Sequence, residues 1–386
     1  MNSRERVQIA LNHQEPDRIP FDFGGTALTS MSSFNYNSTR TAFGLHPVAP
    51  RIMDIFQQNV MVDDDLLTIL GCDVRSVSPD LPQGFSYNIR EDSSGYSLIR
   101  DEWGIGWKKS IDDGLYYDMY EHPLAGDISI DQLKDHHWPN PTDPDRFKYF
   151  AKKAAKFAIE DKCAVTLGGF CSGIVEMTSW LRGYSDFYID IAQDDKTLGY
   201  LMDKVVELKQ AYWEEALAQV GDNVDVVMEA DDMAGQFNLL ISPRSYRKII
   251  KPRHKKLFDF IKSRTNAKLF FHSCGAIRPL IPDLIEIGVD ILNPVQVNAT
   301  GMDSADLKRD FGNEITFWGG GVDTQGDFSS TEPRTDLVTK DVKKRIDDLK
   351  TGGGFIFSAV HNIQANVAPE NIIAMWMEYK HLCNYE

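Results

Sequence analysis

The chain has 386 residues, of which 42% are hydrophobic and 25% are charged, so a large core can form and disorder is not expected. Its formal net charge of −16 comes from 57 acidic and 41 basic residues, which argues against nucleic acid and anionic membranes as partners. No apolar run is long enough to cross a membrane, residues 1–19 contain no signal sequence, and the 5 cysteines lack disulfide-framework spacing. We therefore expect a cytoplasmic protein.

Short apolar runs alternate with longer amphipathic stretches, which is the pattern of βα units around a parallel sheet. The strands are predicted at residues 19–23, 72–77, 164–170, 224–229, 267–272, 289–292, 314–318 and 354–358. The clearest helices are predicted at residues 242–264, 279–287, 335–349 and 369–382. Eight such units predict an α/β fold of the (β/α)₈ (TIM) barrel type, with one domain spanning residues 1–386. The alternative is an open doubly wound sheet, but Gly24-Gly25 is too short for its phosphate-binding turn.

Residues 81–140 interrupt this alternation. The segment is rich in aromatic residues, glycine and paired charges, and it contains a turn sequence at residues 92–95. We predict antiparallel hairpins inserted after the second strand, on the side where barrel enzymes have their active sites. A lid or docking surface and an extra layer over the barrel wall remain equally open.

His272 and Cys274 form the sharpest candidate site. They follow an apolar strand, and residues i and i+2 of a strand point to the same side, so the imidazole and the thiol project together at the catalytic end of the barrel. His361 lies just past the eighth strand on the same rim. Three protein donors with one open position are typical of catalytic zinc, so we predict a Zn²⁺ site. The alternatives are a buried cysteine acting as a small hydrophobe and a loop histidine bonded to backbone.

Other rim residues are weaker candidates. Glu229 and Asp232 lie in an acidic run after the fourth strand, where carboxylates need a cation, hydrogen bonds or solvent. We predict catalytic roles for both, with Glu229 as a metal ligand, a partner that orients a ligating histidine, or a general base. A solvated loop with an N-cap aspartate is the alternative. Asp22, Gln296 and Asp323 follow the first, sixth and seventh strands and are predicted to bind substrate.

Several of these segments together resemble the uroporphyrinogen decarboxylase superfamily. The resemblance covers almost the whole chain, and it is carried by residues 4–6, 16–20, 231–235, 239–243, 272–275, 290–296, 318–325 and 360–363. It implies the (β/α)₈ fold independently of the strand count.

The superfamily contains two kinds of chemistry. True uroporphyrinogen decarboxylases have an arginine-rich N-terminal segment that holds the substrate carboxylates. The corresponding residues 21–37 of this chain contain no arginine, so the resemblance does not extend to that segment. The other branch contains zinc- and corrinoid-dependent methyltransferases, such as methylcobamide:coenzyme M methyltransferases and the methyltransferase components of O-demethylases. Their zinc ligands are an H-x-C pair, matched here by His272 and Cys274, and a cysteine after the last strand. At that last position this chain has His361.

The resemblance therefore implies a zinc-dependent methyltransferase. It would move a methyl group between a small substrate, either a thiol or a methyl ether, and a cobalamin-type corrinoid carried by a separate protein. The chain has no D-x-H-x-x-G motif with which to hold cobalamin itself. One alternative is a metal-free decarboxylase in which Asp22 or Asp232 handles protons. Another is a non-catalytic barrel that binds a small ligand or a corrinoid carrier.

Overall fold

Seven parallel strands form one sheet in the computed structural model, which describes residues 1–385. Their order in the sheet is β13-β12-β11-β10-β9-β8-β3, so neighbours along the chain are neighbours in the sheet. Each strand lies inside a predicted range or extends one residue beyond it: β3 (Val74–Val77), β8 (Ala164–Leu167), β9 (Val226–Ala230), β10 (Lys268–His272), β11 (Ile291–Asn293), β12 (Thr316–Trp318) and β13 (Phe355–Ile356).

The first predicted strand closes this sheet into a barrel. Phe21 pairs in parallel with Phe357, whose backbone N–H donates to the Pro20 carbonyl at 2.9 Å. On the other side the Asp73 N–H donates to the Phe21 carbonyl at 2.8 Å. Residues 20–22 thus lie between β13 and β3 as the eighth member, and the (β/α)₈ prediction is confirmed.

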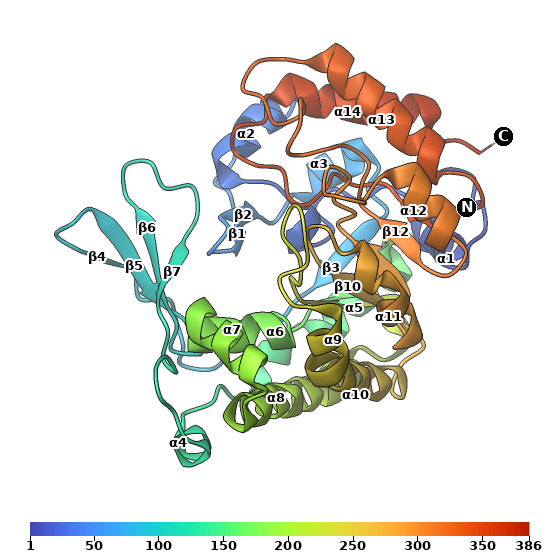
Figure 1. The fold of residues 1–386 in the computed structure, drawn as a ribbon. Helices are drawn as coiled ribbons and strands as arrows, with labels where there is room; N and C mark the ends of the chain where they lie inside the picture. Colours follow the sequence, from blue (N-terminus) through green and yellow to red (C-terminus); the bar gives the residue numbers. More distant parts are fainter. Residues whose placement is uncertain (386) are drawn as a thin grey trace.

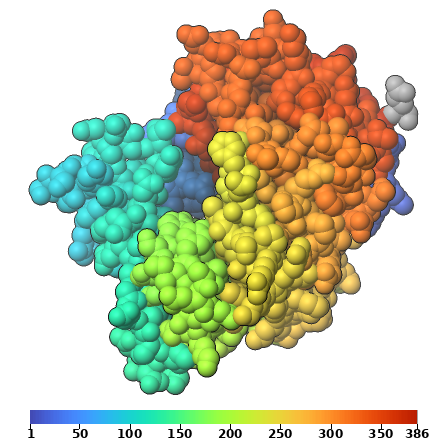
Figure 2. Space-filling view, in the orientation of Figure 1, coloured from blue at the N-terminus to red at the C-terminus, as the bar shows by residue number. Residues whose placement is uncertain are grey.

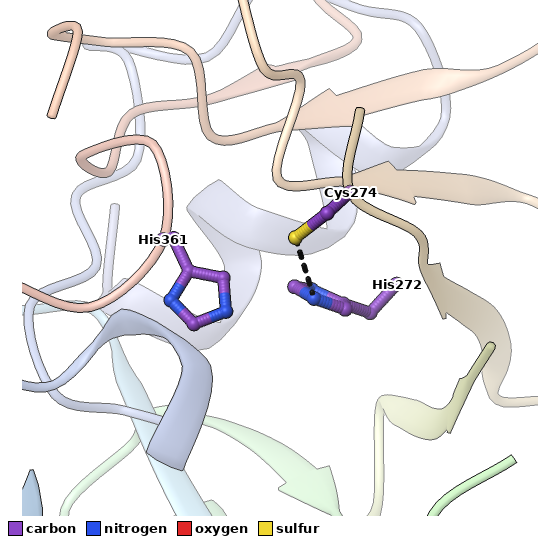
Figure 3. A group of neighbouring side chains, drawn as sticks. All are labelled: His272, Cys274 and His361. Atoms are coloured by element: carbon purple, nitrogen blue, oxygen red, sulfur yellow. Dashed lines mark hydrogen bonds between the residues drawn. The ribbon is translucent and has the colours of Figure 1, made fainter. Parts of the chain in front are cut away.

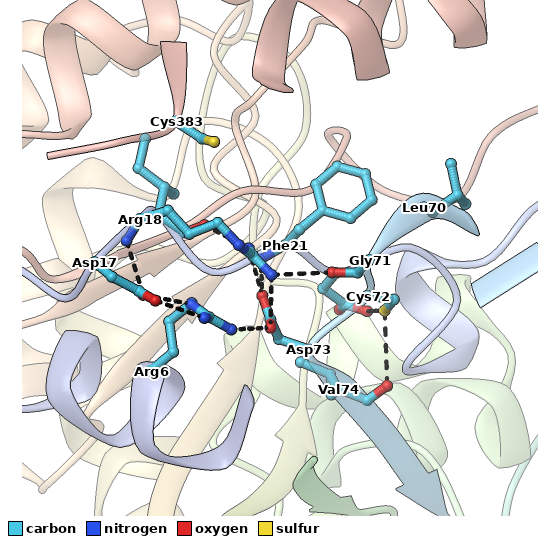
Figure 4. Close-up of polar contacts among 12 residues, drawn as sticks. Arg6, Asp17, Arg18, Phe21, Leu70, Gly71, Cys72, Asp73, Val74 and Cys383 are labelled. Carbon is cyan, nitrogen blue, oxygen red and sulfur yellow. Dashed lines mark hydrogen bonds and ion pairs between the residues drawn. The ribbon is translucent and has the colours of Figure 1, made fainter. Parts of the chain in front are cut away.

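Ion pairs at the amino-terminal end of the barrel fix this closing segment (Figure 4). The fully buried Asp73 accepts hydrogen bonds from Arg6 at 2.7 Å, from Arg18 at 2.8 and 2.9 Å, and from the Phe21 N–H at 2.8 Å. Arg6 is in turn held by Asp17 at 2.6 Å. Each buried charge here has an opposite partner, which is what a structural ion-pair network requires.

The barrel interior is filled with side chains. One apolar cluster contains an inward-pointing residue from each sheet strand together with Val7 and Leu11 of α1 (Ser3–Leu11), so α1 covers the barrel floor. Those strand residues are Val74, Ala164, Val226, Phe270, Ile291, Trp318 and Ile356. The opposite, carboxyl-terminal end is therefore the end that is left for a site.

Helices surround the barrel (Figure 1), and the four clearest predicted ones are confirmed. The predicted helix 242–264 begins with a cap, in which the Ser242 hydroxyl accepts the Ser245 N–H at 3.1 Å, and runs through a π turn to Lys262. None of the described helices is both long and apolar enough to cross a membrane. The main outer helices are α2 (Ser33–Ala42), α3 (Asp64–Leu70), α5 (Phe150–Ala155), α6 (Ile174–Arg182), α7 (Tyr184–Gln193), α8 (Lys196–Val220), α9 (Pro243–Ser245), α10 (Lys251–Lys262), α11 (Ile281–Glu286), α12 (Ser304–Phe311), α13 (Thr335–Leu349) and α14 (Pro369–Leu382).

The predicted insertion is a four-stranded antiparallel sheet, β4-β5-β6-β7, between β3 and β8. Its turn lies at the predicted residues, because the Asp92 N–H bonds the Tyr96 carbonyl. Figure 1 shows the hairpins extending away from the barrel body. A short hairpin at residues 52–60 was not predicted. The bounds are β1 (Ile52–Asp54), β2 (Asn59–Val60), β4 (Arg90–Glu91), β5 (Tyr96–Arg100), β6 (Gly106–Ser110), β7 (Asp118–Glu121) and α4 (Ile130–Asp135).

Candidate metal centre

The alternation of β10 directs His272 into the barrel mouth. Phe270 packs edge-on against Trp318 inside the barrel, with ring centroids 5.5 Å apart, and the side chain two residues later points to the same side. Cys274 follows in the loop, and its Sγ lies 3.4 Å from His272 Nε2 (Figure 3). The imidazole and the thiol therefore project together, as their spacing predicts.

His361 reaches the same point from the turn after β13. Its backbone has φ of +66°, a left-handed conformation that turns the chain sharply at the rim. The His361 and His272 rings have centroids 5.1 Å apart, and one ligand atom each of His272, Cys274 and His361 all lie within 4.8 Å of one another. The structure thus brings together the three predicted metal ligands from two distant segments.

Asn293 determines which nitrogen of the His272 imidazole carries the hydrogen. Asn293 donates its amide to the Trp318 carbonyl at 2.8 Å, so its Oδ1 faces His272 Nδ1 at 2.5 Å. Oδ1 can only accept, which places the imidazole hydrogen on Nδ1 and leaves a lone pair on Nε2. Metal-ligating histidines are commonly oriented in this way.

His361 is also contacted by an asparagine. Asn362 donates its amide to Asn59 Oδ1 at 2.7 Å, and its own Oδ1 contacts His361 Nδ1. The Asn362 backbone N–H also donates to His361 Nδ1 at 2.9 Å, so Nδ1 lies within reach of a donor and an acceptor of the same residue. Burial, and then the nearby His272, lower the pKa of His361 to about 4, so the ring is neutral at physiological pH. Neutral imidazole is the form that binds a metal ion.

Asp232 lies beside His272 and Cys274, and the charge of a second carboxyl group, that of Glu176, also acts on Cys274. Asp232 Oδ1 accepts the Cys274 N–H at 2.7 Å and lies 3.8 Å from His272 Nε2. Glu176, in the first turn of α6, is close enough for its charge to act on both Asp232 and Cys274. Burial, followed by these two carboxylates, raises the pKa of the Cys274 thiol well above its ordinary value. This negative environment favours a cation.

Glu229 is placed elsewhere, although it was predicted to be catalytic. It lies in register with Phe271, which packs against α10, so both side chains face the outer helices. Its carboxylate pairs with the buried Lys209 at 3.0 Å and accepts the Trp213 indole N–H at 2.6 Å. These contacts bind β9 to α8, and they do not bring Glu229 to the three donors.

The three predicted substrate-binding residues are held by the protein itself. Asp22 accepts the Gly25 N–H at 2.8 Å and the Trp318 indole N–H at 2.9 Å, and it is 1% exposed. Gln296 joins two neighbouring loops by accepting the Gly275 N–H at 2.8 Å and donating to Gln236 at 2.7 Å. Asp323 accepts from Asn298 at 3.0 Å and is half-buried in the loop after β12. These contacts shape the rim, and their substrate-binding role stays a prediction.

Glu176 was missed by the sequence analysis. It lies in no recognisable motif, and the segment 171–182 was not assigned a role. Its position in the first turn after the third barrel strand was the available signal, because strand ends on that side meet at one rim.

The surface is hollowed next to the loop that carries Asp232. Figure 2 shows a hollow between the insertion (cyan and teal), α6 and α7 (green) and the residues of the loop after β9 (yellow). That loop also exposes Phe237, at 72%, and Leu240, at 49%. Among the described residues, no lysine or arginine bonds the three donors, Asp232 or the Glu176 carboxyl. The side chain of Asp232 is 39% exposed, and no lysine or arginine of residues 1–385 pairs with it.

Known proteins resemble this chain in fold. A methyltransferase from Methanosarcina mazei superposes with a TM-score of 0.65 at 16% identity, covering 99% of both chains. A hyperthermophilic beta-glucosidase from Pyrococcus furiosus has a TM-score of only 0.39 at 10% identity, covering 95% of this chain and 96% of its own. No curated protein sequence matches significantly. The family model for uroporphyrinogen decarboxylase (URO-D) matches residues 120–382, more than half of the chain. This chain therefore belongs to the uroporphyrinogen decarboxylase family.

Proposed function

We propose that this protein is a zinc-dependent methyltransferase, which moves a methyl group between a small thiol or methyl ether and a corrinoid carried by a separate protein. The convergence of His272, Cys274 and His361 within 4.8 Å carries the proposal. The chain belongs to the uroporphyrinogen decarboxylase family, and its fold resembles a solved structure described as a methyltransferase. Zn²⁺ and a cobalamin-type partner are parts of this proposal.

The donor set fits zinc in chemistry and in spacing. Zn–N bonds of about 2.1 Å and Zn–S bonds of about 2.3 Å, set at the tetrahedral angle, separate the two donor atoms by about 3.6 Å. The observed separation of His272 Nε2 and Cys274 Sγ is 3.4 Å. Two imidazoles and one thiolate suit a borderline-soft cation, and three ligands leave one position for substrate.

The residues at the mouth would have different roles in the reaction. His272, Cys274 and His361 would hold Zn²⁺, which when bound would act as a Lewis acid toward a thiol sulfur or an ether oxygen. Asn293 fixes the ligating tautomer of His272, and Asn362 contacts Nδ1 of His361. The exposed loop after β9 would border the approach of a partner domain.

The chief alternative is a decarboxylase that uses no metal. Decarboxylation of a polycarboxylate substrate calls for guanidinium or ammonium groups that hold the carboxylates. Among residues 1–385, no lysine or arginine forms a hydrogen bond or an ion pair with the carboxyl group of Asp232 or of Glu176. This arrangement favours a substrate that carries little negative charge. A non-catalytic barrel that binds a corrinoid carrier is the second alternative.

Metal content and methyl transfer test the proposal together. The wild-type protein, purified without chelators, is expected to hold one zinc per chain, and His272→Ala, Cys274→Ala and His361→Ala are expected to lose it. The matched controls, His46→Ala at the surface and Cys383→Ala outside the site, should keep it. The wild type should also demethylate methylcobalamin in the presence of a thiol. Sub-stoichiometric zinc with no methyl transfer would favour the decarboxylase, and methyl transfer unchanged in His272→Ala would favour a site elsewhere.

A further inference from the structure

The loop after β9 lies alongside the segment that carries two of the three donors. Three consecutive residues of the loop form hydrogen bonds with three consecutive residues of that segment. The pairs are the Asp231 N–H with the His272 carbonyl at 2.9 Å, Asp232 Oδ1 with the Cys274 N–H at 2.7 Å, and the Met233 N–H with the Ser273 hydroxyl at 3.3 Å. The position of this loop therefore sets the course of the main chain from His272 to Cys274.

The contact continues past Cys274. The Ala276 N–H donates to the Gly235 carbonyl at 2.9 Å. Gly275 has φ of +81°, and a Cβ there would lie 2.5 Å from the Gly235 carbonyl oxygen, so a side chain would force the two segments apart. Residues 231–235 and 272–276 thus form one packed unit at the rim.

Asp231 connects this unit to the outer helices. Its side chain is fully buried. Oδ1 accepts the Glu176 N–H of α6 at 2.9 Å, and Oδ2 lies 2.6 Å from His254 Nε2 of α10. A carboxylate can only accept, which places a hydrogen on His254 Nε2. Because the Asp231 N–H bonds the His272 carbonyl, this residue links α10, on the outside of the barrel, to a donor inside it.

His254 is itself enclosed by aromatic side chains. Its ring stacks on Phe258 and meets Phe271 edge-on, with centroids 5.4 Å apart in both pairs, and the Tyr246 hydroxyl lies 3.4 Å from Nδ1. The residue is 1% exposed. A polar ring buried among aromatic groups is stable there only with its hydrogen bonds formed, so the bond to Asp231 holds both partners in place.

We propose that His254 is a positioning residue of the metal centre. By holding Asp231, it keeps the loop after β9 against residues 272–276 and thereby sets the separation and direction of the His272 and Cys274 donors. His254 lies on the outer side of β10, next to Phe271, so it acts through Asp231 without touching the metal ion. This role rests on the proposed zinc centre.

A purely structural His254 has different consequences. Loss of a buried hydrogen bond to a carboxylate lowers stability wherever the bond lies. Arg182 of α6 provides the matched control, because it is 6% exposed and its guanidinium bonds Asp190 of α7 at 2.9 Å and the Gly126 carbonyl of the insertion at 2.7 Å. Arg182→Met should lower stability and leave the centre unaltered.

Two substitutions separate the hydrogen bond from the volume of the imidazole ring. His254→Leu removes the donor to Asp231 and keeps an apolar side chain in its place. His254→Gln keeps an N–H donor at a similar reach, so it should restore the contact. His254→Asn, whose amide is one methylene shorter, replaces His254→Leu as the variant without the bond if the leucine variant does not fold.

The first readout needs no metal ion. In zinc-free protein, amide hydrogen exchange within residues 231–235 and 272–276 should be about 10-fold faster or more in His254→Leu, because the loop after β9 opens locally. Exchange in the same residues should match the wild type in His254→Gln and in Arg182→Met.

The second and third readouts report on the metal site. Zinc affinity, measured by competition with a chromophoric chelator, should fall about 10- to 100-fold in His254→Leu. In cobalt-substituted protein, the thiolate-to-cobalt charge-transfer band should shift in His254→Leu. His254→Gln should recover the wild-type affinity and spectrum, and Arg182→Met should keep both.

The outcomes separate this inference from the proposed function. A wild type that binds zinc beside a His254→Leu of equal affinity and equal cobalt spectrum overturns the positioning role alone. A His254→Gln that behaves like His254→Leu also overturns it, and so does an Arg182→Met that loses as much affinity, because the effect would then follow stability in general. A wild type that binds no zinc overturns the proposed function, and this inference falls with it.

Discussion

Acidic side chains have cationic partners at one end of the barrel and lack them at the other, among the described residues. At the amino-terminal end, Asp73 is fully buried and two guanidinium groups, from Arg6 and Arg18, contact it within 2.9 Å. At the carboxyl-terminal end, Asp232 lies beside His272 and Cys274, and no lysine or arginine among the described residues bonds the carboxyl group of Asp232 or of Glu176. Buried charge that is balanced within the chain stabilises the fold, whereas unbalanced charge in a cleft marks a place where something else binds.

Glu229 and Glu176 differ in the same way. Glu229 lies one residue before the inward-facing end of β9, and Lys209 balances its charge on the outside of the barrel. Glu176 is less buried, and its carboxyl group has no cationic partner among residues 1–385. The buried Glu229 thus has a lysine opposite it, whereas the half-buried Glu176 has none among residues 1–385.

The largest effect is expected at the balanced end. Asp73→Asn should lower the free energy of unfolding by about 3 to 5 kcal/mol, because it leaves two guanidinium groups facing a neutral amide. Chemical denaturation of the zinc-loaded protein measures the loss. Asp17→Asn, at a half-exposed position, is the control and should cost less than about 1 kcal/mol. Equal losses from the two variants would contradict the structural role assigned to Asp73.

The buried ion pair between Lys209 of α8 and Glu229 of β9 should also contribute strongly to stability. Glu229→Gln and Lys209→Met are each expected to lose about 3 kcal/mol of stability, since each leaves a buried charge without its partner, and the double variant should lose less than the sum. Zinc content should not change in Glu229→Gln. If that variant lost its zinc while remaining folded, Glu229 would belong to the metal site after all.

At the unbalanced end, stability should depend on pH. The pKa of Glu176 is about 8 in the folded chain, compared with its ordinary 4.5 when unfolded, so its contribution is fully present below pH 4.5 and is lost as the pH rises through 8. For the zinc-free protein the loss should be about 2 to 4 kcal/mol. Denaturation midpoints measured across this range should decline in the wild type and decline less in Glu176→Gln. Parallel curves for the two proteins would rule out a raised pKa.

The smallest effect concerns the orientation of one donor. Asn293→Ala removes the acceptor that fixes the His272 tautomer, and zinc affinity should fall about 10- to 100-fold. Competition with a chromophoric chelator measures this change. Asn298→Ala, which removes a loop contact to Asp323, is the control and should keep wild-type affinity. An unchanged affinity in Asn293→Ala would show that the tautomer is fixed in another way.

Local sequence patterns were enough to predict the barrel, the insertion and the meeting of three donors. Hydrophobic periodicity locates buried parallel strands, and the H-x-C spacing already places two donors on one side of β10. The orientation of Glu229 could not be predicted in this way. A buried parallel strand is apolar on both faces, so its sequence does not show to which side an acidic residue points. Glu176 depends on contacts between α6 and the loop after β9, and no local pattern encodes them.

The composition of the metal shell tests the central claim most directly. X-ray absorption spectroscopy at the zinc edge of the purified protein should show one sulfur at about 2.3 Å and two imidazole nitrogens at about 2.0 to 2.1 Å, with the sulfur lost in Cys274→Ala. A shell of oxygen and nitrogen without sulfur, or a protein that takes up no zinc at all, would contradict the proposed centre.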